Sequence, residues 1–263
     1  MDLGLAGKVA LVSGASSGLG LAIARELAAE GVNVALLARR KEELEKHAAE
    51  ISLAGPGKAV AVAGDVTKAG DAERCASEAV GHLGAIDILV ANAGGPPSTT
   101  FDSTSDAQYQ AAFELNLFGS IRLAHACVPS MRARKWGRVV FLTSMAAKQP
   151  VPGLLLSNTM RAGLLGFAKT LSAEVAREGV TVNTVLPGHF DTQRAIDLAN
   201  MRAEREKKSF DEVMRLRLAS VPMGRTGDPR EMAALVTFLA STRAAFITGT
   251  AIQIDGGQVA TIL

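Results

Sequence analysis

The chain has 263 residues, of which 48% are hydrophobic and 21% are charged, and its formal net charge is only +2. This composition is typical of a soluble globular protein with a sizeable core and argues against a disordered chain. The densest basic run, residues 131–138, lies where a helix should end and cations are favourable, so we expect no nucleic-acid partner.

The cysteines and the apolar stretches bear on the cellular compartment. Cys75 and Cys127 lie in separate expected helices and form no CxxC motif, which favours a reduced intracellular protein over a disulfide scaffold. The first apolar run has no basic leader, so we expect no signal peptide. No uncharged apolar stretch is long enough to span a bilayer. We therefore expect a cytoplasmic protein that binds neither a membrane nor a metal ion.

Short β-branched runs alternate with longer amphipathic segments along the chain. The expected strands are residues 8–15, 33–39, 59–66, 86–94, 138–144, 180–188 and 251–257. The expected helices are residues 19–30, 41–54, 68–83, 106–134 and 160–178. Continuous apolar runs indicate strands covered on both faces, and the alternation indicates parallel strands. We predict an α/β fold: a single Rossmann-type, doubly wound domain over residues 1–263, with a seven-stranded parallel sheet and helices on both faces.

One irregular insertion, residues 189–227, interrupts this alternation. Its charged piece, residues 202–209, is typical of a solvated helix face, whereas Phe210, Val213 and Met214 would share one side of a helix. A loop and helix after the sixth strand can cover a cleft. We therefore predict a substrate lid at about residues 189–227, although its sequence indicates no particular substrate.

The first expected strand runs into the glycine-rich loop "SGASSGLG", which opens a helix. Glycine lets the chain turn sharply and approach a pyrophosphate closely, and the helix N-terminus supplies unpaired N–H groups. No Gly-Lys-Ser or Gly-Lys-Thr follows, which argues against a nucleoside-triphosphate loop. The alternative is a tight turn that binds nothing. We predict a dinucleotide site. Its loop residues are Ser13, Gly14, Ser16, Ser17, Gly18, Leu19 and Gly20.

The end of the second expected strand distinguishes between two cofactors. An acidic residue there would bind the ribose 2′-hydroxyl of NAD, whereas an arginine would neutralise the 2′-phosphate of NADP. This chain has Arg39 and Arg40 at that point and no carboxylate. An ordinary basic helix start is the alternative, but cations are unfavourable at a helix N-terminus. We therefore favour NADP(H) over NAD(H) as the cofactor.

Further motifs accompany the glycine loop. They are Asp65-Val66, Asn92-Ala93-Gly94, Asn116, Ser144, Pro187-Gly188 with Thr192, and the closing run at residues 247–257. With these motifs the chain resembles the short-chain dehydrogenase/reductase (SDR) family over nearly its whole length, and it is most similar to 3-oxoacyl-acyl-carrier-protein reductases and their sugar-alcohol dehydrogenase relatives.

The resemblance implies roles for several of these residues. Asp65 would accept a hydrogen bond from the adenine amino group, the turn at residues 92–94 would border the adenine ribose, and Thr192 would hold the nicotinamide amide. It also implies a homotetramer that associates through the two helices at residues 106–134 and 160–178 and through the last strand, with the apolar residues 259–263 buried.

The same resemblance implies a catalytic tetrad of which this chain has only half. In the family a tyrosine donates the proton, a serine binds the same oxygen, a lysine lowers the tyrosine's pKa and grips the nicotinamide ribose, and an asparagine positions a water. Asn116 and Ser144 match the asparagine and the serine. Ser157 and Arg161 stand where the tyrosine and the lysine belong. The chain's single tyrosine, Tyr109, cannot replace the missing one, because residue 113 is Phe.

Ser157 and Arg161 are one helical turn apart, so their side chains share a face. An arginine stays protonated and cannot relay a proton, and a serine hydroxyl is a far weaker acid than a phenol. Arg161 can still hold ribose hydroxyls through its N–H donors. Lys148 and His189 follow the fifth and sixth expected strands, so either could replace the missing proton donor, although each is also typical of a solvated loop.

Two functional hypotheses remain open. The first is an NADP(H)-dependent oxidoreductase that acts on a carbonyl or alcohol of a small-molecule or acyl-thioester substrate. The second is an NADP-binding scaffold or sensor that has lost catalysis. The retained Asn116, Ser144 and Thr192 favour the first, and the missing tyrosine and lysine favour the second. We adopt the first hypothesis, with Asn116, Ser144, Ser157 and Arg161 as its catalytic residues.

Overall fold

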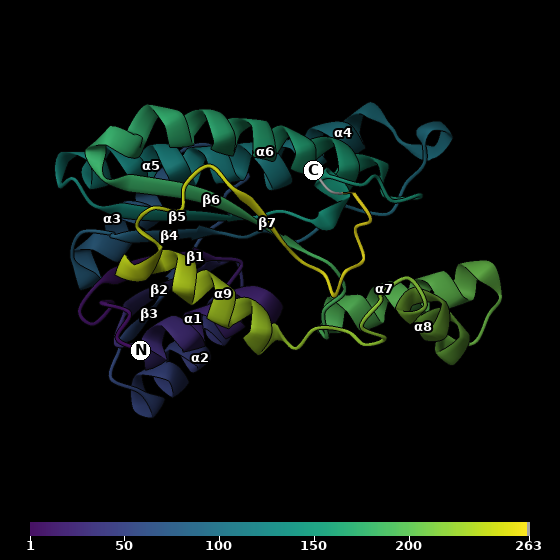
Figure 1. Cartoon of the computed structure of the whole chain (residues 1–263), viewed down its shortest axis with the longest axis horizontal. Helices are drawn as coiled ribbons and strands as arrows, with labels where there is room; N and C mark the ends of the chain where they lie inside the picture. The colour runs from purple at the N-terminus through teal and green to yellow at the C-terminus, as the bar shows by residue number, and fades with distance from the viewer. Residues whose placement is uncertain (262–263) are drawn as a thin grey trace.

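The computed structural model describes residues 1–261 and has a single β-sheet at its centre (Figure 1). The sheet has seven strands in the order β3-β2-β1-β4-β5-β6-β7, and each neighbouring pair is parallel. The strands are β1 Val9–Ser13, β2 Asn33–Ala38, β3 Ala59–Ala63, β4 Ile88–Ala91, β5 Gly137–Leu142, β6 Val180–Pro187 and β7 Ala251–Ile254. The chain order reverses between β1 and β4, where doubly wound folds bind their ligands. The predicted fold class is confirmed.

All seven predicted strands are present, but each ends one to three residues before its predicted boundary. The residues beyond the strand ends leave the sheet and line a cleft at its carboxyl edge, as Gly14, Asp65 and Ser144 do. Their polar or glycine character at the end of an apolar run is the local reason that pairing stops there. The sequence therefore predicted the strands well and their carboxyl ends less well.

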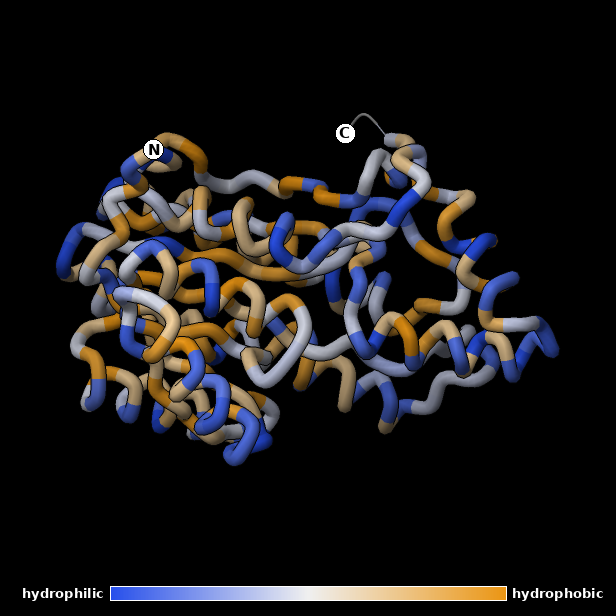
Figure 2. Tube along the Cα trace, turned by 90° about the horizontal axis from the view of Figure 1, so that it is seen from below, coloured by the Kyte–Doolittle hydropathy of each residue, from blue (hydrophilic) through white to orange (hydrophobic). Residues whose placement is uncertain are grey.

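Helices cover both faces of the sheet, as Figure 1 shows. One face packs against α1 Gly18–Ala29, α2 Lys41–Ala54 and α9 Pro229–Ala240. The other packs against α3 Asp71–Leu83, α5 Gly119–Ala133 and α6 Leu155–Val175. Alternate side chains of β1 enter opposite layers, because successive residues of a strand point to opposite faces. Figure 2 shows the strands as a largely hydrophobic trace through the middle of the molecule.

The predicted helix at residues 106–134 is helical throughout but not uniform. It consists of α4 Asp106–Phe113, a π-helical turn Glu114–Phe118, and α5. Single π turns of this kind often occur at functional sites, and this one contains Asn116. The sequence pattern could not reveal the turn, because all three segments share helical periodicity.

The predicted helix at residues 160–178 begins earlier than expected. α6 starts at Leu155, and a 3₁₀ turn, Ala176–Glu178, completes it. The early start is stabilised by Leu156, which is fully buried against Ala112 and Met160. As a result Ser157 lies in the first turn of α6, and Arg161 lies one turn further on.

The predicted lid segment forms two helices, α7 Gln193–Glu206 and α8 Phe210–Leu218. They pack against each other through Ala199, Ala203, Val213 and Met214. Phe210, which we expected on the same side, is 37% exposed and lies outside this cluster. Figure 1 shows the pair standing away from the sheet, past its carboxyl edge. Within residues 1–261, no helix combines the length and apolar character needed to cross a membrane.

Candidate active site

A cleft of about 620 Å³ opens at the carboxyl edge of the sheet. It brings together nearly all the residues that the sequence suggested for a cofactor or catalytic site. They are Ser13, Gly14, Ser16, Ser17, Gly18, Leu19, Arg39, Arg40, Asp65, Val66, Asn92, Ala93, Gly94, Ser144, Ser157, Arg161, Pro187, Gly188 and Thr192. Gly20 and Asn116 do not line it.

The glycine loop is tied to the end of β4 by reciprocal hydrogen bonds. The Ser13 hydroxyl donates to the Asn92 carbonyl at 2.8 Å and accepts from the Asn92 N–H at 2.9 Å. Gly14 has a φ of +63°, which favours glycine, and a Cβ there would lie 2.6 Å from the Asn92 side-chain nitrogen. The loop is therefore held rigidly against the neighbouring strand and leaves no room for larger residues.

Gly20 lies behind the loop, in the first turn of α1. A Cβ on Gly20 would lie only 2.3 Å from the carbonyl oxygen of Gly14, so its role is close packing of the helix on the loop. Ser17, the N-cap of α1, forms no side-chain cap hydrogen bond, and the first turn contains no acidic residue. The N–H groups of that turn are thus available to an anion, as a pyrophosphate requires.

Arg39 and Arg40 follow β2 and form a positively charged side of the cleft, here called the positive wall. The Arg40 guanidinium donates to the Ser16 hydroxyl at 3.0 Å and the Ser17 hydroxyl at 3.3 Å, and it pairs with Glu43 at 2.9 Å. Arg39 is exposed and has no hydrogen-bond or ion-pair partner in the described part of the chain. Arg40 therefore braces the loop, and Arg39 is free to meet a phosphate.

Asp65 lies at the edge of the cleft, after β3. One carboxylate oxygen accepts from the Thr67 N–H at 3.1 Å and from the Thr67 hydroxyl at 2.8 Å. This turn holds the carboxylate in place. Its expected contact with an adenine amino group remains a prediction.

Asn116 supports the site from behind. Its side chain is 1% exposed, and its amide donates to the Gly94 carbonyl at 2.6 Å. The side-chain oxygen is buried and has no partner within residues 1–261. We expected Asn116 among the catalytic residues, but the structure places its side chain against the turn at residues 92–94, outside the cleft lining.

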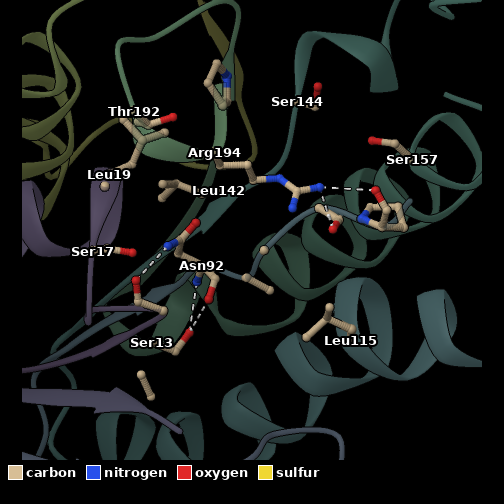
Figure 3. A pocket seen from close by; sticks show the side chains of 18 of the residues that line it. Ser13, Ser17, Leu19, Asn92, Leu115, Leu142, Ser144, Ser157, Thr192 and Arg194 are labelled. Atoms are coloured by element: carbon tan, nitrogen blue, oxygen red, sulfur yellow. Dashed lines mark hydrogen bonds between the residues drawn. The ribbon is translucent and has the colours of Figure 1, made fainter. Parts of the chain in front are cut away.

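Ser144 and Ser157, two of the expected catalytic residues, both line the cleft. The Ser144 hydroxyl caps a 3₁₀ turn, Met145–Ala147, and accepts from the Ala146 N–H at 3.1 Å. Ser157 is half-buried, and its hydroxyl has no hydrogen bond in the part of the chain described. Figure 3 draws both hydroxyls in the same part of the cleft, beside the Arg194 guanidinium.

Arg161 is buried beneath this pair and joins two strand ends. Its guanidinium donates to the Leu142 carbonyl at 2.7 Å and to the Ala93 carbonyl at 3.2 Å. Burial, followed by the charge of Arg194, lowers its pKa to about 10, so it stays charged at neutral pH. We expected its donors to hold ribose hydroxyls, but two of them are committed to the backbone, and that role remains a prediction.

Two cleft residues were missed by the sequence reasoning. Arg194, in the first turn of α7, donates to the Gly95 carbonyl at 2.7 Å and the Pro96 carbonyl at 3.2 Å, and so connects α7 to the turn after β4. Arg217, in α8, donates to the Ala195 carbonyl at 3.2 Å. Burial lowers the pKa of both guanidinium groups. The segment at residues 189–227 is rich in charged residues, so no local signal distinguished these two.

Lys148 and His189, the suggested substitute proton donors, do not line the cleft. The His189 ring turns toward the C-terminal segment, where its Nε2 lies 3.1 Å from the Gln258 side-chain nitrogen. Burial, and then the charge of Arg217, lowers its pKa to about 4. The imidazole is therefore neutral at pH 7. Strand order was expected to place both side chains near the cleft, and neither contributes to its lining.

The lowered pKa of His189 predicts a loss of stability in acid. Because its folded-state pKa of about 4 lies below the ordinary 6.5, protonation favours the unfolded chain. The penalty is absent above pH 6.5 and grows as the pH falls toward 4. After discounting for partial exposure, His189→Gln should remove about 1–2 kcal/mol of the loss of unfolding free energy between pH 7 and 4.

Urea titrations at several pH values would measure this difference. His82→Gln, at an exposed position in α3, is the matched control, because it makes the same substitution away from the surroundings of His189. Equal acid sensitivity in wild type and His189→Gln would contradict the prediction.

Comparison with known proteins agrees with this geometry. Residues 14–258 match the protein family described as Enoyl-(Acyl carrier protein) reductase. The 3-oxoacyl-[acyl-carrier-protein] reductase FabG of Vibrio cholerae is 36% identical, over 97% of this chain and 99% of the relative. The human Dehydrogenase/reductase SDR family member 4 is also 36% identical, over 96% and 88%. L-sorbose reductase from Gluconobacter frateurii, solved with NADPH and L-sorbose, superposes with a TM-score of 0.94 at 33% identity, over the full length of both chains.

Proposed function

The chain belongs to the short-chain dehydrogenase/reductase family, and on that premise we propose that it transfers hydride between NADP(H) and the carbonyl or alcohol group of a small-molecule or acyl-thioester substrate. One observation carries the proposal: a single cleft unites the glycine loop, the positive wall after β2 and the two serine hydroxyls. The NADPH complexes of L-sorbose reductase support the choice of cofactor.

The residues of the cleft fit such a cofactor. The first turn of α1 would bind the pyrophosphate, and Arg39 and Arg40 would bind the 2′-phosphate. Thr192, whose side chain caps α7 by accepting from the Ala195 N–H at 3.3 Å, would hold the nicotinamide amide. When bound, the nicotinamide supplies or accepts the hydride.

The chain's own residues would act on the substrate oxygen. The Ser144 and Ser157 hydroxyls would donate hydrogen bonds to it, and the positive charges of Arg161 and Arg194 would stabilise the negative charge that develops there. Neither serine is acidic enough to be a fast proton donor. We propose that a water held by Ser157 delivers the proton, which makes this reductase slower than one with a tyrosine.

The positive wall predicts a clear cofactor preference. NADPH should bind at least tenfold tighter than NADH, or about 1.4 kcal/mol, because guanidinium contacts to a phosphate are strong. Arg39→Asp should reverse the order, since a carboxylate accepts from the ribose 2′-hydroxyl and repels the phosphate.

Nicotinamide fluorescence titrations would measure both affinities. Arg25→Asp, on the outer face of α1 and outside the cleft, is a matched control that should change neither. Equal affinities of the wild type for the two cofactors would defeat the prediction.

The function itself is tested by NADPH consumption across a panel of ketones, oxoacyl thioesters and sugars. Turnover that falls in Ser144→Ala supports the reductase. The second candidate function is an NADP-binding scaffold or sensor. It is favoured by the hydrogen bonds of Arg161 to two backbone carbonyls, because donors used in this way support the fold and are not available to the substrate or cofactor. Tight NADPH binding with no turnover of any panel member would support that alternative.

We extend the proposal to assembly and location. By analogy with the family, we propose a cytoplasmic homotetramer that associates through the α4–α6 face and β7. Of the apolar segment expected at the subunit contact, residues 259–261 follow β7, and residues 262 and 263 lie outside the described residues.

A further inference from the structure

Three guanidinium groups line the cleft beyond the positive wall: Arg161, Arg194 and Arg217. Within residues 1–261, none of the three has a carboxylate within the 4.0 Å of an ion pair, whereas Arg202 and Arg205 of the same lid both pair with Glu206. Arg161 is buried and Arg217 is half-buried, and cations in such positions are ordinarily paired, whereas Arg194 is exposed. Asp191 and Asp197 act on Arg217 and Arg194 only from beyond ion-pair distance.

The single acidic residue among the described residues that line the cleft is Asp65. It follows β3, the edge strand, whereas Ser144 follows β5. Four strand spacings separate β3 from β5, which places them roughly 19 Å apart. Asp65 therefore cannot neutralise the arginines around Ser144 and Ser157.

The two lid arginines also have unused hydrogen-bond donors. Arg194 employs one nitrogen for both the Gly95 and Pro96 carbonyls, which leaves its other donors without a partner in the described chain. Arg217 employs one nitrogen for the Ala195 carbonyl, and its buried Nε has no partner within residues 1–261. The unpaired Arg217 Nε is buried, which is unfavourable, whereas the unused donors of Arg194 are exposed to water. An anionic acceptor in the cleft would therefore stabilise Arg217 most, and it would also give Arg194 a charged partner.

We propose that Arg194 and Arg217 bind a carboxylate carried by the substrate, so that the substrate is an oxo acid rather than a neutral ketone or sugar. This inference rests on the proposed function. In the reduction, the carbonyl carbon accepts hydride from NADPH, the C=O π bond breaks, and the oxygen takes a proton from a water that is reprotonated by bulk solvent, so that one H⁺ is consumed. The products are a hydroxy acid and NADP⁺, and the carboxylate is unchanged.

The charge that develops during turnover favours this assignment. A nicotinamide ring carries a positive charge once it is oxidised, and Thr192, which would hold its amide, lines the same cleft as Arg161 and Arg194. Without an anion in the substrate, the reaction would add positive charge to a region that already has three cations. A substrate carboxylate compensates for that charge and is matched in shape by the planar fork of an arginine.

The test compares acids with their amides, which differ mainly in charge. Turnover is measured for pyruvate, acetoacetate and levulinate against pyruvamide, acetoacetamide and levulinamide. In a second arm, which requires no activity, the NADPH complex is titrated with butanoate and butanamide, and NADPH fluorescence is followed. The acid should bind at least about tenfold tighter than the amide, as expected for a guanidinium–carboxylate contact.

Variants of Arg194 and Arg217 test the contribution of each arginine separately. Arg217→Gln and Arg194→Gln should each reduce the acid-to-amide ratio to about threefold or less, and Arg217→Lys should restore part of it because the charge returns. Arg205→Gln, on α7 but outside the cleft, should keep the wild-type ratio. If Arg194→Gln loses NADPH binding because the lid is released, Arg217→Gln decides the outcome.

The two arms separate this inference from the proposed function. Preferential binding of butanoate without any turnover would uphold the anion site and count against the reductase. Equal binding of acid and amide, with turnover of both ketone types, would overturn the anion site alone. An acid preference that both glutamine variants retain would also overturn it. Equal binding of the acid and the amide, combined with a preference for a phosphopantetheine thioester over the corresponding pantetheine thioester, would show that the arginines bind a phosphate. That result would overturn the assignment of an oxo-acid substrate.

Discussion

Changing Ser157 to tyrosine together with Arg161 to lysine is expected to raise NADPH-dependent turnover of a simple ketone by at least about tenfold, the low side of what general acid catalysis contributes. Ser157 borders the cleft beside Ser144 and has no competing hydrogen bond in the described chain, so a phenol at this position would extend into the space where the substrate oxygen belongs. Arg161 lies one turn further along α6.

Each single change should give a smaller gain. A tyrosine without the lysine keeps too high a pKa to donate efficiently, and a lysine without the tyrosine has nothing to activate. Arg161→Lys also gives up the guanidinium fork that reaches both the Leu142 and Ala93 carbonyls. The two substitutions should therefore act together, and the excess of the double variant over the two single variants is the quantity to measure.

NADPH absorbance gives the rates, and NADPH fluorescence with a thermal melt shows whether each variant binds cofactor and folds. A folded double variant that binds NADPH but stays at the background rate would count against a latent reductase site. If wild type outpaces the double variant on its own substrate, the proton comes from another source. Because Lys148 and His189 lie outside the cleft lining, water held near Ser157 is then the first candidate.

Gly20→Ala is expected to lower the free energy of unfolding by about 2–3 kcal/mol, because overpacking a rigid contact costs this much. The added Cβ would lie 2.3 Å from the Gly14 carbonyl oxygen and 2.9 Å from the Asn92 side-chain nitrogen. Neither neighbour can yield easily, because Ser13 ties the loop to β4 on its other side. The loop must therefore shift, and we expect NADPH to bind at least about tenfold more weakly.

Gly81→Ala is the matched control in a helix. Gly81 lies in α3, and no atom lies within 4 Å of a Cβ built there. The usual benefit of alanine over glycine in a helix should raise the unfolding free energy by about 0.5–1 kcal/mol and leave NADPH affinity unchanged. Urea unfolding and fluorescence titration measure both effects. A Gly20→Ala protein as stable as wild type would show that the loop adapts.

The sequence by itself determined the fold and the layout of the cofactor end of the cleft. Strands, helices and the glycine loop are set by patterns within a few residues, because apolar periodicity, glycine and β-branching act locally. The agreement is closest at α2, predicted and observed at residues 41–54. Parallel strands then bring their carboxyl ends to one edge, so residues after different strands, such as Gly14, Asp65 and Ser144, meet without further information.

Only the tertiary structure decided which partners the charged side chains around Ser144 and Ser157 bind. Arg161 bonds to Ala93, 68 residues earlier in the chain, and Arg194 bonds to Gly95, 99 residues earlier. His189 turns away toward Gln258, 69 residues later. At the end of a helix or strand, the local sequence allows a long side chain to point in several directions. The direction it takes depends on where an unpaired carbonyl or a surface that can bury it lies nearby. Those partners come from distant parts of the chain, so no local sequence pattern could identify them.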